Sequence, residues 1–304
     1  MSKKVLVLMG GFSAERDVSL ITGKGVANAL KKKNYNVVCY DLKNGFKFVE
    51  KLKKEKPDVV FNALHGNFGE DGEIQGMLDV LQIPYTHSGL KASILGMDKN
   101  LTKFVATQNG ITIADSEKMT FADFKKKGTK IKMPYVVKPV SDGSSVGVYI
   151  VKNDKDKEKV FYENDEREIL VEKFIKGQEI TVSVLNGKAL GITEIRPKVE
   201  FYNYEAKYTD GITQHILLAE IPDDISKQAR KYAETLHQAL GCHTISRCDF
   251  IYNSVDGVVF LEINTNPGMT PLSLVPEQAK YAGLTYEDVC VALVEEASCR
   301  RLKE

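Results

Sequence analysis

The chain has 304 residues, of which 43% are hydrophobic and 27% charged, a composition typical of a globular protein with two or three domains. Lys and Arg number 42 against 41 Asp and Glu, so net charge provides no general attraction to nucleic acid or to an anionic membrane, and we expect neither as a partner. The first apolar run, VLVLMG, is too short for the hydrophobic part of a secretory signal, and no run approaches the roughly 18 to 20 residues that cross a bilayer.

Residues 1–87 alternate strand and helix patterns. Apolar runs such as VLVLMG and NVVCYD are separated by the amphipathic segment ERDVSLITGKGVANALKKK, and this alternation predicts a parallel sheet with functional residues at the carboxyl ends of its strands. GGFSAER follows the first strand and HGNFGEDG the third, so Ser13, Glu15 and His65 should meet at one sheet edge. Neither a dinucleotide-binding fingerprint nor a Walker P-loop occurs, so a nucleotide would bind by other means.

Residues 88–172 form a second predicted unit. It begins with one helix over 89–110, followed by the strands PYVVKPV, VYIV and EILVEKF. The loop between the first two strands, SDGSSVG at 141–147, offers backbone N–H groups and hydroxyls to a phosphate. A plain β-hairpin turn remains the alternative interpretation of this loop.

Residues 173–304 form the third predicted unit. Strands lie around 179–195, and a polar, aromatic loop KVEFYNYEAKYTDG follows. The helix DDISKQARKYAETLHQALG, the strands TISRCDFIY and GVVFLEINT, and two C-terminal helices complete the chain.

The five cysteines are odd in number, scattered, and never form C-x-x-C, which indicates reduced thiols and a cytoplasmic protein. Cys242, His243 and Cys248 suggest a zinc site, but no fourth ligand stands at a recognised spacing. We therefore interpret these cysteines as core residues of strands.

The two late strands are joined by turn residues and should form an antiparallel hairpin. Pairing Asn253 with Val258 would set Asp249 opposite Glu262 on one face of the sheet. The opposite face of the second strand, Val259, Leu261 and Ile263, would then form a core stripe.

The same register would set Arg247 opposite Asn264, beside the two carboxylates. An isolated E-x-N strand end is most often only solvated, but facing carboxylates such as Asp249 and Glu262 repel unless a cation lies between them. Oxygen ligands of this kind suit Mg²⁺. Arg247 is then either a structural counter-ion to Asp249 or a group that stabilises charge on a transferring phosphoryl or acyl phosphate group.

Eight sequence blocks, in order over nearly the full length, resemble D-alanine–D-alanine ligases of the ATP-grasp superfamily. The blocks are GGFSAERDVS, ALHGNFGEDG, MDKNLTK, VVKPVSDGSSVGV, VEKFIKGQE, FYNYEAKY, SRCDF and EINTNPGMTPLSLVP. The resemblance implies a fold of mixed α+β and α/β class, with three ATP-grasp ligase domains of which the N-terminal one has a parallel sheet. We place these domains at 1–87, 88–172 and 173–304.

The resemblance also implies where ATP and metal bind. ATP would lie between the second and third domains, its phosphates contacted by lysines and by the 141–147 loop, its adenine lined by residues 172–175 and its ribose bound by Glu179. The residues implied for ATP are Lys99, Lys138, Ser145, Glu172, Phe174, Ile175, Glu179 and Lys207. Asp249, Glu262 and Asn264 are the implied ligands of a pair of Mg²⁺ or Mn²⁺ ions.

For the substrate, the resemblance implies that Glu15 anchors an ammonium together with Ser144 and Tyr208. Arg247 and the Gly268 N–H would stabilise an oxyanion, so that the implied catalytic residues are Glu15, Ser144, Tyr208, Arg247 and Gly268. His65, Ser273 and Leu274 would lie against the substrates. Asn266 and Leu272 stand where some relatives carry other polar residues, which leaves details of acceptor binding open, and Phe174 stands where an indole is sometimes found.

The activity implied is ATP-dependent ligation of two D-alanine molecules through an acyl phosphate, for peptidoglycan synthesis, by a cytoplasmic homodimer. A ligase that joins D-alanine to D-lactate or D-serine is the nearest alternative. A noncatalytic nucleotide-binding sensor is an alternative of another class, in which Arg247 and the metal ligands would have no task.

Overall fold

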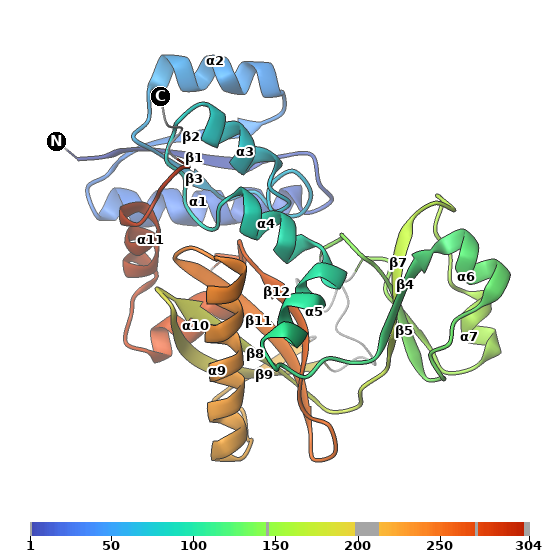
Figure 1. The fold of residues 1–304 in the computed structure, drawn as a ribbon. Helices are drawn as coiled ribbons and strands as arrows, with labels where there is room; N and C mark the ends of the chain where they lie inside the picture. Colours follow the sequence, from blue (N-terminus) through green and yellow to red (C-terminus); the bar gives the residue numbers. More distant parts are fainter. Residues whose placement is uncertain (1, 144–145, 198–212, 271–272, 301–304) are drawn as a thin grey trace.

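The computed structural model describes residues 2–143, 146–197, 213–270 and 273–300. Within these residues the chain forms a parallel sheet and two antiparallel sheets, arranged as a compact body and a projecting lobe (Figure 1). None of the described helices is both long and apolar enough to span a membrane.

The N-terminal unit contains the predicted parallel sheet, in the order β2-β1-β3. The central strand is the VLVLM run, whose residues Val5 to Leu8 are fully buried, as expected for a strand covered on both faces. The elements are β1 (Lys4–Gly10), α1 (Arg16–Lys32), β2 (Asn36–Leu42), α2 (Gly45–Glu55), β3 (Val59–Asn62) and α3 (Glu73–Val80).

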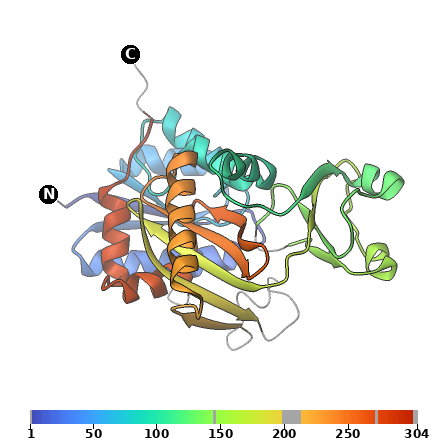
Figure 2. The ribbon, with the colours of Figure 1, turned by 60° about the horizontal axis from the view of Figure 1, so that its bottom comes forward.

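The central unit is the lobe at the right of Figures 1 and 2. Its antiparallel sheet has the order β4-β7-β5-β6 and packs against two short helices through a small aromatic core that includes Phe121, Phe124 and Tyr135. The elements are β4 (Ser116–Thr120), α6 (Phe121–Lys127), β5 (Tyr135–Pro139), β6 (Tyr149–Val151), α7 (Asp154–Glu158) and β7 (Glu168–Lys173).

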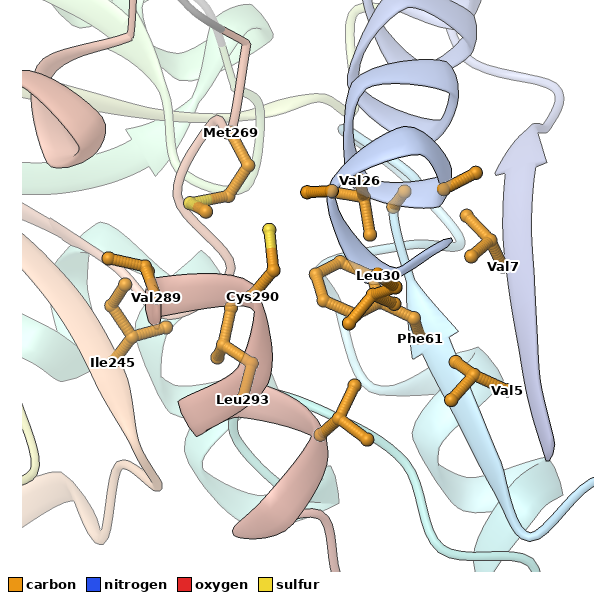
Figure 3. Packing of buried hydrophobic residues seen from close by; sticks show 14 of the residues in the cluster. Val5, Val7, Val26, Leu30, Phe61, Ile245, Met269, Val289, Cys290 and Leu293 are labelled. Atoms are coloured by element: carbon orange, nitrogen blue, oxygen red, sulfur yellow. The ribbon is translucent and has the colours of Figure 1, made fainter. Parts of the chain in front are cut away.

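The C-terminal unit has a second antiparallel sheet, in the order β10-β9-β8-β11-β12. Helix α9 covers one face, and α11 packs against α1, so that a shared core joins this unit to the parallel sheet; Phe61, Cys290 and Leu293 lie in that core (Figure 3). The elements are β8 (Gln178–Leu185), β9 (Lys188–Pro197), β10 (Thr213–Leu217), α9 (Asp223–Leu240), β11 (Ile245–Asn253), β12 (Gly257–Asn264), α10 (Leu274–Tyr281) and α11 (Tyr286–Glu295).

The helix predicted over 89–110 is two helices, α4 (Leu90–Met97) and α5 (Lys99–Gln108). The break lies at Asp98, whose backbone is extended and whose carboxylate accepts hydrogen bonds from the N–H groups of Asn100 and Leu101. An N-cap of this kind favours a new helix start over continuation of the old helix. Both helices pack against β12, and α5 also packs against α9, so they lie on the C-terminal sheet.

The predicted hairpin register is confirmed at the polar residues and wrong at the turn. Asp249 pairs with Glu262 and Arg247 with Asn264, but Asn253 pairs with Gly257 instead of Val258. Gly257 has φ +73°, which permits a three-residue turn. A β-bulge between Asp249 and the next residue then restores the predicted pairing.

The bulge also changes which side chains of β12 form the core. Ile263 packs in the core of the C-terminal unit as predicted, but Val258 and Phe260 pack there with it, against the predicted alternation. Val259 is buried as predicted, but Leu261, the extra residue at the bulge, is only half-buried and lines a cavity.

Candidate active site

A cavity of about 390 Å³ lies between the central and C-terminal sheets. Its volume is in the range of small-molecule sites. Most of the residues predicted for ATP line it, as do two of the predicted metal ligands: Lys99, Lys138, Glu172, Phe174, Ile175, Glu179, Asp249 and Glu262. Apolar side chains from both sheets, Val136, Ile150, Ile251 and Leu261, complete much of the wall.

A buried ion triad lies at the wall that β5 and β7 form. The Lys138 ammonium is 2.5 Å from one carboxylate oxygen of Glu172, and the Lys103 ammonium is 2.6 Å from the other. All three side chains are less than a tenth exposed. Burial alone would raise the pKa of the Glu172 carboxyl, but Lys138 and Lys103 outweigh burial and lower this pKa to about 2. Glu172 is therefore a carboxylate at every physiological pH.

The loop at 141–147 is held at both ends. The Lys99 ammonium donates to the backbone carbonyl of Asp142 at 2.5 Å, and the Asp142 carboxylate forms an ion pair with Arg167. At the other end, the Tyr162 hydroxyl donates to the Gly147 carbonyl at 2.6 Å. The loop joins the antiparallel strands β5 and β6, as a hairpin turn does, and its anchors come from α5 and from the segment between α7 and β7.

The polar face of the hairpin forms a network around Asp249. Arg247 donates to both carboxylate oxygens, at 3.0 Å from Nε and 2.8 Å from Nη2. The Thr181 hydroxyl donates to Oδ1 at 2.5 Å, and the Asn264 amide donates to Oδ2 at 3.3 Å. Arg247 thus makes the counter-ion contact, and on the neighbouring strand the Glu262 carboxylate lies 3.9 Å from the Lys99 ammonium.

The donor set of this network fits a hard divalent cation. Asp249 and Glu262 offer carboxylate oxygens and Asn264 an amide oxygen, the ligand types that Mg²⁺ and Mn²⁺ prefer, while substrate phosphate and water ordinarily complete such a shell. Within the described residues no group of three or more His, Cys, Asp and Glu side chains could hold a metal ion. The third protein donor would therefore be the amide.

The substrate-side residues meet at the edge of the parallel sheet, as predicted. The Ser13 hydroxyl donates to the His65 carbonyl at 2.6 Å and accepts from the Glu15 N–H at 3.2 Å. Gly143 of the 141–147 loop lies against Glu15, because a Cβ built on Gly143 would lie 3.3 Å from a Glu15 carboxylate oxygen. Asp142, the residue before Gly143, lines the cavity, so the Glu15 carboxylate lies near the cavity.

The His65 ring is buried between two polar partners. Its Nε2 lies 3.0 Å from the Thr22 hydroxyl, and its Nδ1 lies 3.1 Å from the Glu70 carboxylate. Burial raises the pKa of the Glu70 carboxyl, an effect that His65 opposes in part. This pair fixes the orientation of the ring at the edge of the site.

The segment after β12 carries the remaining predicted residues. The Ser273 hydroxyl accepts from the Thr270 N–H at 3.0 Å and lies beside Gly268, where an added Cβ would approach it to 3.1 Å. Leu274 is buried at the start of α10. The Asn266 amide donates to the Leu64 carbonyl at 2.9 Å, which ties this segment to the residues just before His65. The predicted residues Ser144, Ser145, Lys207, Tyr208 and Leu272 lie outside the described residues.

Three residues of the site were not predicted from the sequence: Lys103, Thr181 and Glu70. Lys103 stands four residues after Lys99, a spacing that places both lysines on one face of α5 and could have indicated it. Thr181 donates to a residue 68 positions away on another strand, and no local pattern signals such a contact.

Comparison with known proteins assigns the family. Residues 4–57 and 43–88 match the family described as D-ala D-ala ligase N-terminus, and residues 101–295 match the D-ala D-ala ligase C-terminus. A D-alanine--D-alanine ligase from Erythrobacter litoralis is 46% identical over 302 residues, which cover 96% of this chain and 93% of the relative.

Two solved structures have the same fold. The structure of a D-alanine--D-Alanine ligase from Bacillus anthracis complexed with ATP has a TM-score of 0.82 and 35% identity, and the match covers 97% of each chain. The structure of VanG D-Ala:D-Ser ligase from Enterococcus faecalis has a TM-score of 0.79 and 27% identity, with 97% of this chain and 99% of that one covered.

A parallel-sheet N-terminal unit followed by two antiparallel sheets that enclose a cavity defines a ligase of the ATP-grasp class. The chain belongs to the D-alanine–D-alanine ligase family.

Proposed function

We propose that the protein joins two D-alanine molecules to D-alanyl-D-alanine, with cleavage of ATP to ADP and phosphate, and so supplies a precursor of peptidoglycan. The observation that carries this proposal is that the cavity predicted to bind ATP lies close to Glu15, the residue predicted to bind the substrate ammonium. The lysine-lined cavity between the two antiparallel sheets lies near the Glu15 carboxylate, which Gly143 of the 141–147 loop approaches. A phosphoryl donor in the cavity would reach the carboxylate of a substrate bound at Glu15.

ATP would occupy the cavity with its base among apolar side chains and its phosphates near the ammonium groups. Phe174 and Ile175 supply an apolar wall, and Glu179 lies at the same cavity as a partner for the ribose hydroxyls. Lys99 and Lys138 supply positive charge for the phosphates, joined in the proposal by Lys207 and by Ser145, which are placed from the sequence alone. Enzymes catalyse phosphoryl transfer mainly by placing cationic groups where they stabilise negative charge on the phosphate oxygens.

Asp249, Glu262 and Asn264 would hold the Mg²⁺ or Mn²⁺ ions that accompany ATP. When bound, such ions neutralise charge on the phosphoryl oxygens. The Thr181 hydroxyl keeps the Asp249 carboxylate oriented toward the cavity. The Lys99 ammonium near Glu262 limits repulsion between the two carboxylates before the substrate arrives.

The first proposed step transfers the γ-phosphoryl group. A carboxylate oxygen of one D-alanine attacks the γ-phosphorus, the bond to the β,γ-bridging oxygen breaks, and ADP leaves with that electron pair. Arg247 and Lys99 offset the negative charge that spreads over the transferring group. Glu15, with Ser144 and Tyr208, would hold the ammonium of this first D-alanine and thereby aim its carboxylate at the cavity.

The second proposed step forms the peptide bond. The neutral amine of a second D-alanine attacks the acyl carbon, and the carbon–oxygen bond to phosphate then breaks. Phosphate leaves with that electron pair and takes up the proton that the amine nitrogen loses. Arg247 and the Gly268 N–H stabilise the oxyanion of the tetrahedral intermediate. His65, Ser273 and Leu274 would position the second D-alanine, and the anchored 141–147 loop would keep water from the acyl phosphate.

Two alternatives are a ligase that uses D-lactate or D-serine as acceptor and a sensor that binds nucleotide without catalysis. The D-alanine--D-alanine ligase from Erythrobacter litoralis is 46% identical to this chain and the D-Ala:D-Ser ligase is 27% identical, which favours D-alanine as acceptor. Tyr208 in the YEAKY block also favours D-alanine, because relatives that make a D-lactate ester resemble this block but carry phenylalanine. A sensor that only binds nucleotide would not use the Arg247 network.

The decisive experiment measures ADP release by the purified protein with ATP and Mg²⁺, with and without D-alanine, and identifies the product by mass. We expect ADP release that requires D-alanine, and a product with the mass of the dipeptide. Tight ATP binding without turnover in the presence of D-alanine would contradict the proposal and favour the sensor.

A second experiment tests the choice of acceptor. In a competition between D-alanine and D-lactate at fixed pH, Tyr208→Phe should raise the share of the D-lactate product.

We also propose a homodimer and a cytoplasmic location, both of which the family resemblance implies. The molar mass in sedimentation equilibrium tests the dimer, since the chain mass is 33.9 kDa.

A further inference from the structure

Lys103 lies behind the wall of the proposed ATP cavity and does not line it. Its side chain is only 2% exposed, and it extends from α5 to the Glu172 carboxylate of β7. The Lys103 ammonium also donates to the carbonyl of Ala114, a residue that lines the cavity, at 3.3 Å. A buried ammonium is costly unless it is paired and hydrogen-bonded, and Lys103 is both.

Lys103 connects two units of the molecule. Helix α5 packs against β12 and α9 of the C-terminal unit, whereas Glu172 and Lys138 belong to the sheet of the projecting lobe (Figure 1). The Lys103–Glu172 contact therefore bridges the two sides between which the cavity lies. A change at Lys103 would affect the position of the wall as well as its charge.

Lys103 affects the charge at the cavity wall through its ion pair with Glu172, which also pairs with Lys138. Two ammonium groups share one carboxylate, so the group of Lys103, Glu172 and Lys138 carries one excess positive charge while both lysines are protonated. Lys138 is the ammonium of this pair that lines the cavity. Without Lys103, the Glu172 carboxylate would pair with Lys138 alone and cancel its charge.

We propose that Lys103 is a positioning residue for ATP binding: it holds Glu172 in place and offsets its charge, so that the Lys138 ammonium keeps its positive charge available for a phosphate group. This inference rests on the proposed use of ATP and adds Lys103 to it as a residue that acts from behind the wall. A purely structural ion pair is the competing explanation.

The test compares variants of the full-length protein. Lys103→Met removes the charge at similar volume, Lys103→Arg keeps the charge, and Lys118→Met is the control, because Lys118 also forms an ion pair on the lobe sheet, with Glu168, but at its surface. For each we would measure the dissociation constant of ATP with Mg²⁺ and without D-alanine by calorimetry, the KM values for ATP and D-alanine, and the thermal midpoint.

We expect Lys103→Met to weaken ATP binding by about tenfold, a typical size for coupling through an intermediate residue, and to change the KM for D-alanine far less. Lys103→Arg should retain most of the affinity, and Lys118→Met should bind ATP as the wild type does. A lowered thermal midpoint with an unchanged ATP dissociation constant in Lys103→Met would overturn the proposal and leave a structural ion pair.

A double variant keeps the test decisive if Lys103→Met does not fold. Lys103→Met with Glu172→Gln removes both charges of the buried pair, which relieves the unpaired carboxylate and again leaves Lys138 uncompensated. We expect this double variant to fold. Its dissociation constant for ATP should lie within about threefold of that of Glu172→Gln, because Lys138 has no carboxylate to cancel its charge in either variant. ATP binding that is lost in the double variant but retained in Glu172→Gln would show that the charge argument is wrong.

The ATP-binding measurement separates this inference from the proposed function. If the wild type binds ATP but does not ligate D-alanine, the proposed reaction fails, and the comparison of dissociation constants still decides the role of Lys103. If the wild type ligates D-alanine and Lys103→Met binds ATP normally, the inference alone fails.

Discussion

Arg247 holds Asp249 by a two-point ion pair along a single strand, with both guanidinium contacts between 2.8 and 3.0 Å. The two residues are two positions apart, so their side chains leave the same face of β11. Thr181 on the adjacent strand donates to the same carboxylate. The guanidinium is thus oriented before substrates arrive, which is the condition under which a fixed charge contributes most to catalysis.

Arg247→Lys should lower turnover by about a hundredfold or more, because lysine keeps the charge but loses the planar fork that grips Asp249. ATP affinity should change far less. Steady-state kinetics together with direct ATP binding measure both quantities. Equal losses of affinity and turnover would indicate that Arg247 serves only as the counter-ion of Asp249.

Glu262→Gln should weaken the response to Mg²⁺ and lower turnover together, because the change keeps the shape of the side chain and removes a ligand charge. The fold should persist, since Glu262 is partly exposed and glutamine keeps the shape of its side chain. Titration of activity with Mg²⁺ tests this, with circular dichroism as the control for folding. Wild-type activity at ordinary Mg²⁺ concentration would rule out Glu262 as a ligand.

Gly257→Ala should destabilise the protein by about 1 kcal/mol, because Gly257 has φ +73° and a Cβ there meets backbone strain. No atom lies within 4 Å of the added Cβ, so the effect would come from the backbone alone. Gly45→Ala is the matched control: it also meets no atom within 4 Å but lies at the first position of α2 without a positive φ. Urea unfolding should show Gly45→Ala neutral or stabilising; equal effects of both variants would contradict the predicted strain.

His87 should make the protein less stable in mild acid. Burial lowers the pKa of its imidazole from 6.5 to about 3, so the folded protein holds this ring neutral. As pH falls below about 6.5, the unfolded chain takes up a proton that the folded chain does not, and the free energy of unfolding declines until about pH 3. Above about pH 6.5 the imidazole is neutral in both the folded and the unfolded chain, so His87 does not lower the free energy of unfolding there.

His87→Asn isolates this effect, because asparagine tolerates the backbone φ of 70° found at this residue and does not titrate. Between about pH 7.5 and pH 5 the wild type should lose about 1 to 2 kcal/mol more stability than the variant. Urea unfolding at each pH measures the difference. Parallel pH profiles for the two proteins would show that the folded state does protonate His87.

The strands, the parallel N-terminal sheet and part of the site could be predicted from residue patterns. Period-two alternation and apolar runs reflect local geometry, and they predicted that Asp249 faces Glu262, as the structure has it. Ser13 and His65 were also predicted to meet, because the ends of parallel strands share one edge of a sheet. These predictions needed only local periodicity and the rules of strand pairing.

The hairpin turn and the completed site network could not be predicted in this way, because both depend on long-range packing. The bulge at Leu261 depends on which side chains fill the core against α9, so an ideal register placed that residue in the core instead of the cavity. Lys103 meets Glu172, and Thr181 meets Asp249, across large sequence separations and different elements. Such contacts depend on the path of the whole chain, because the free energy of a buried charge is set by the partners that folding brings to it.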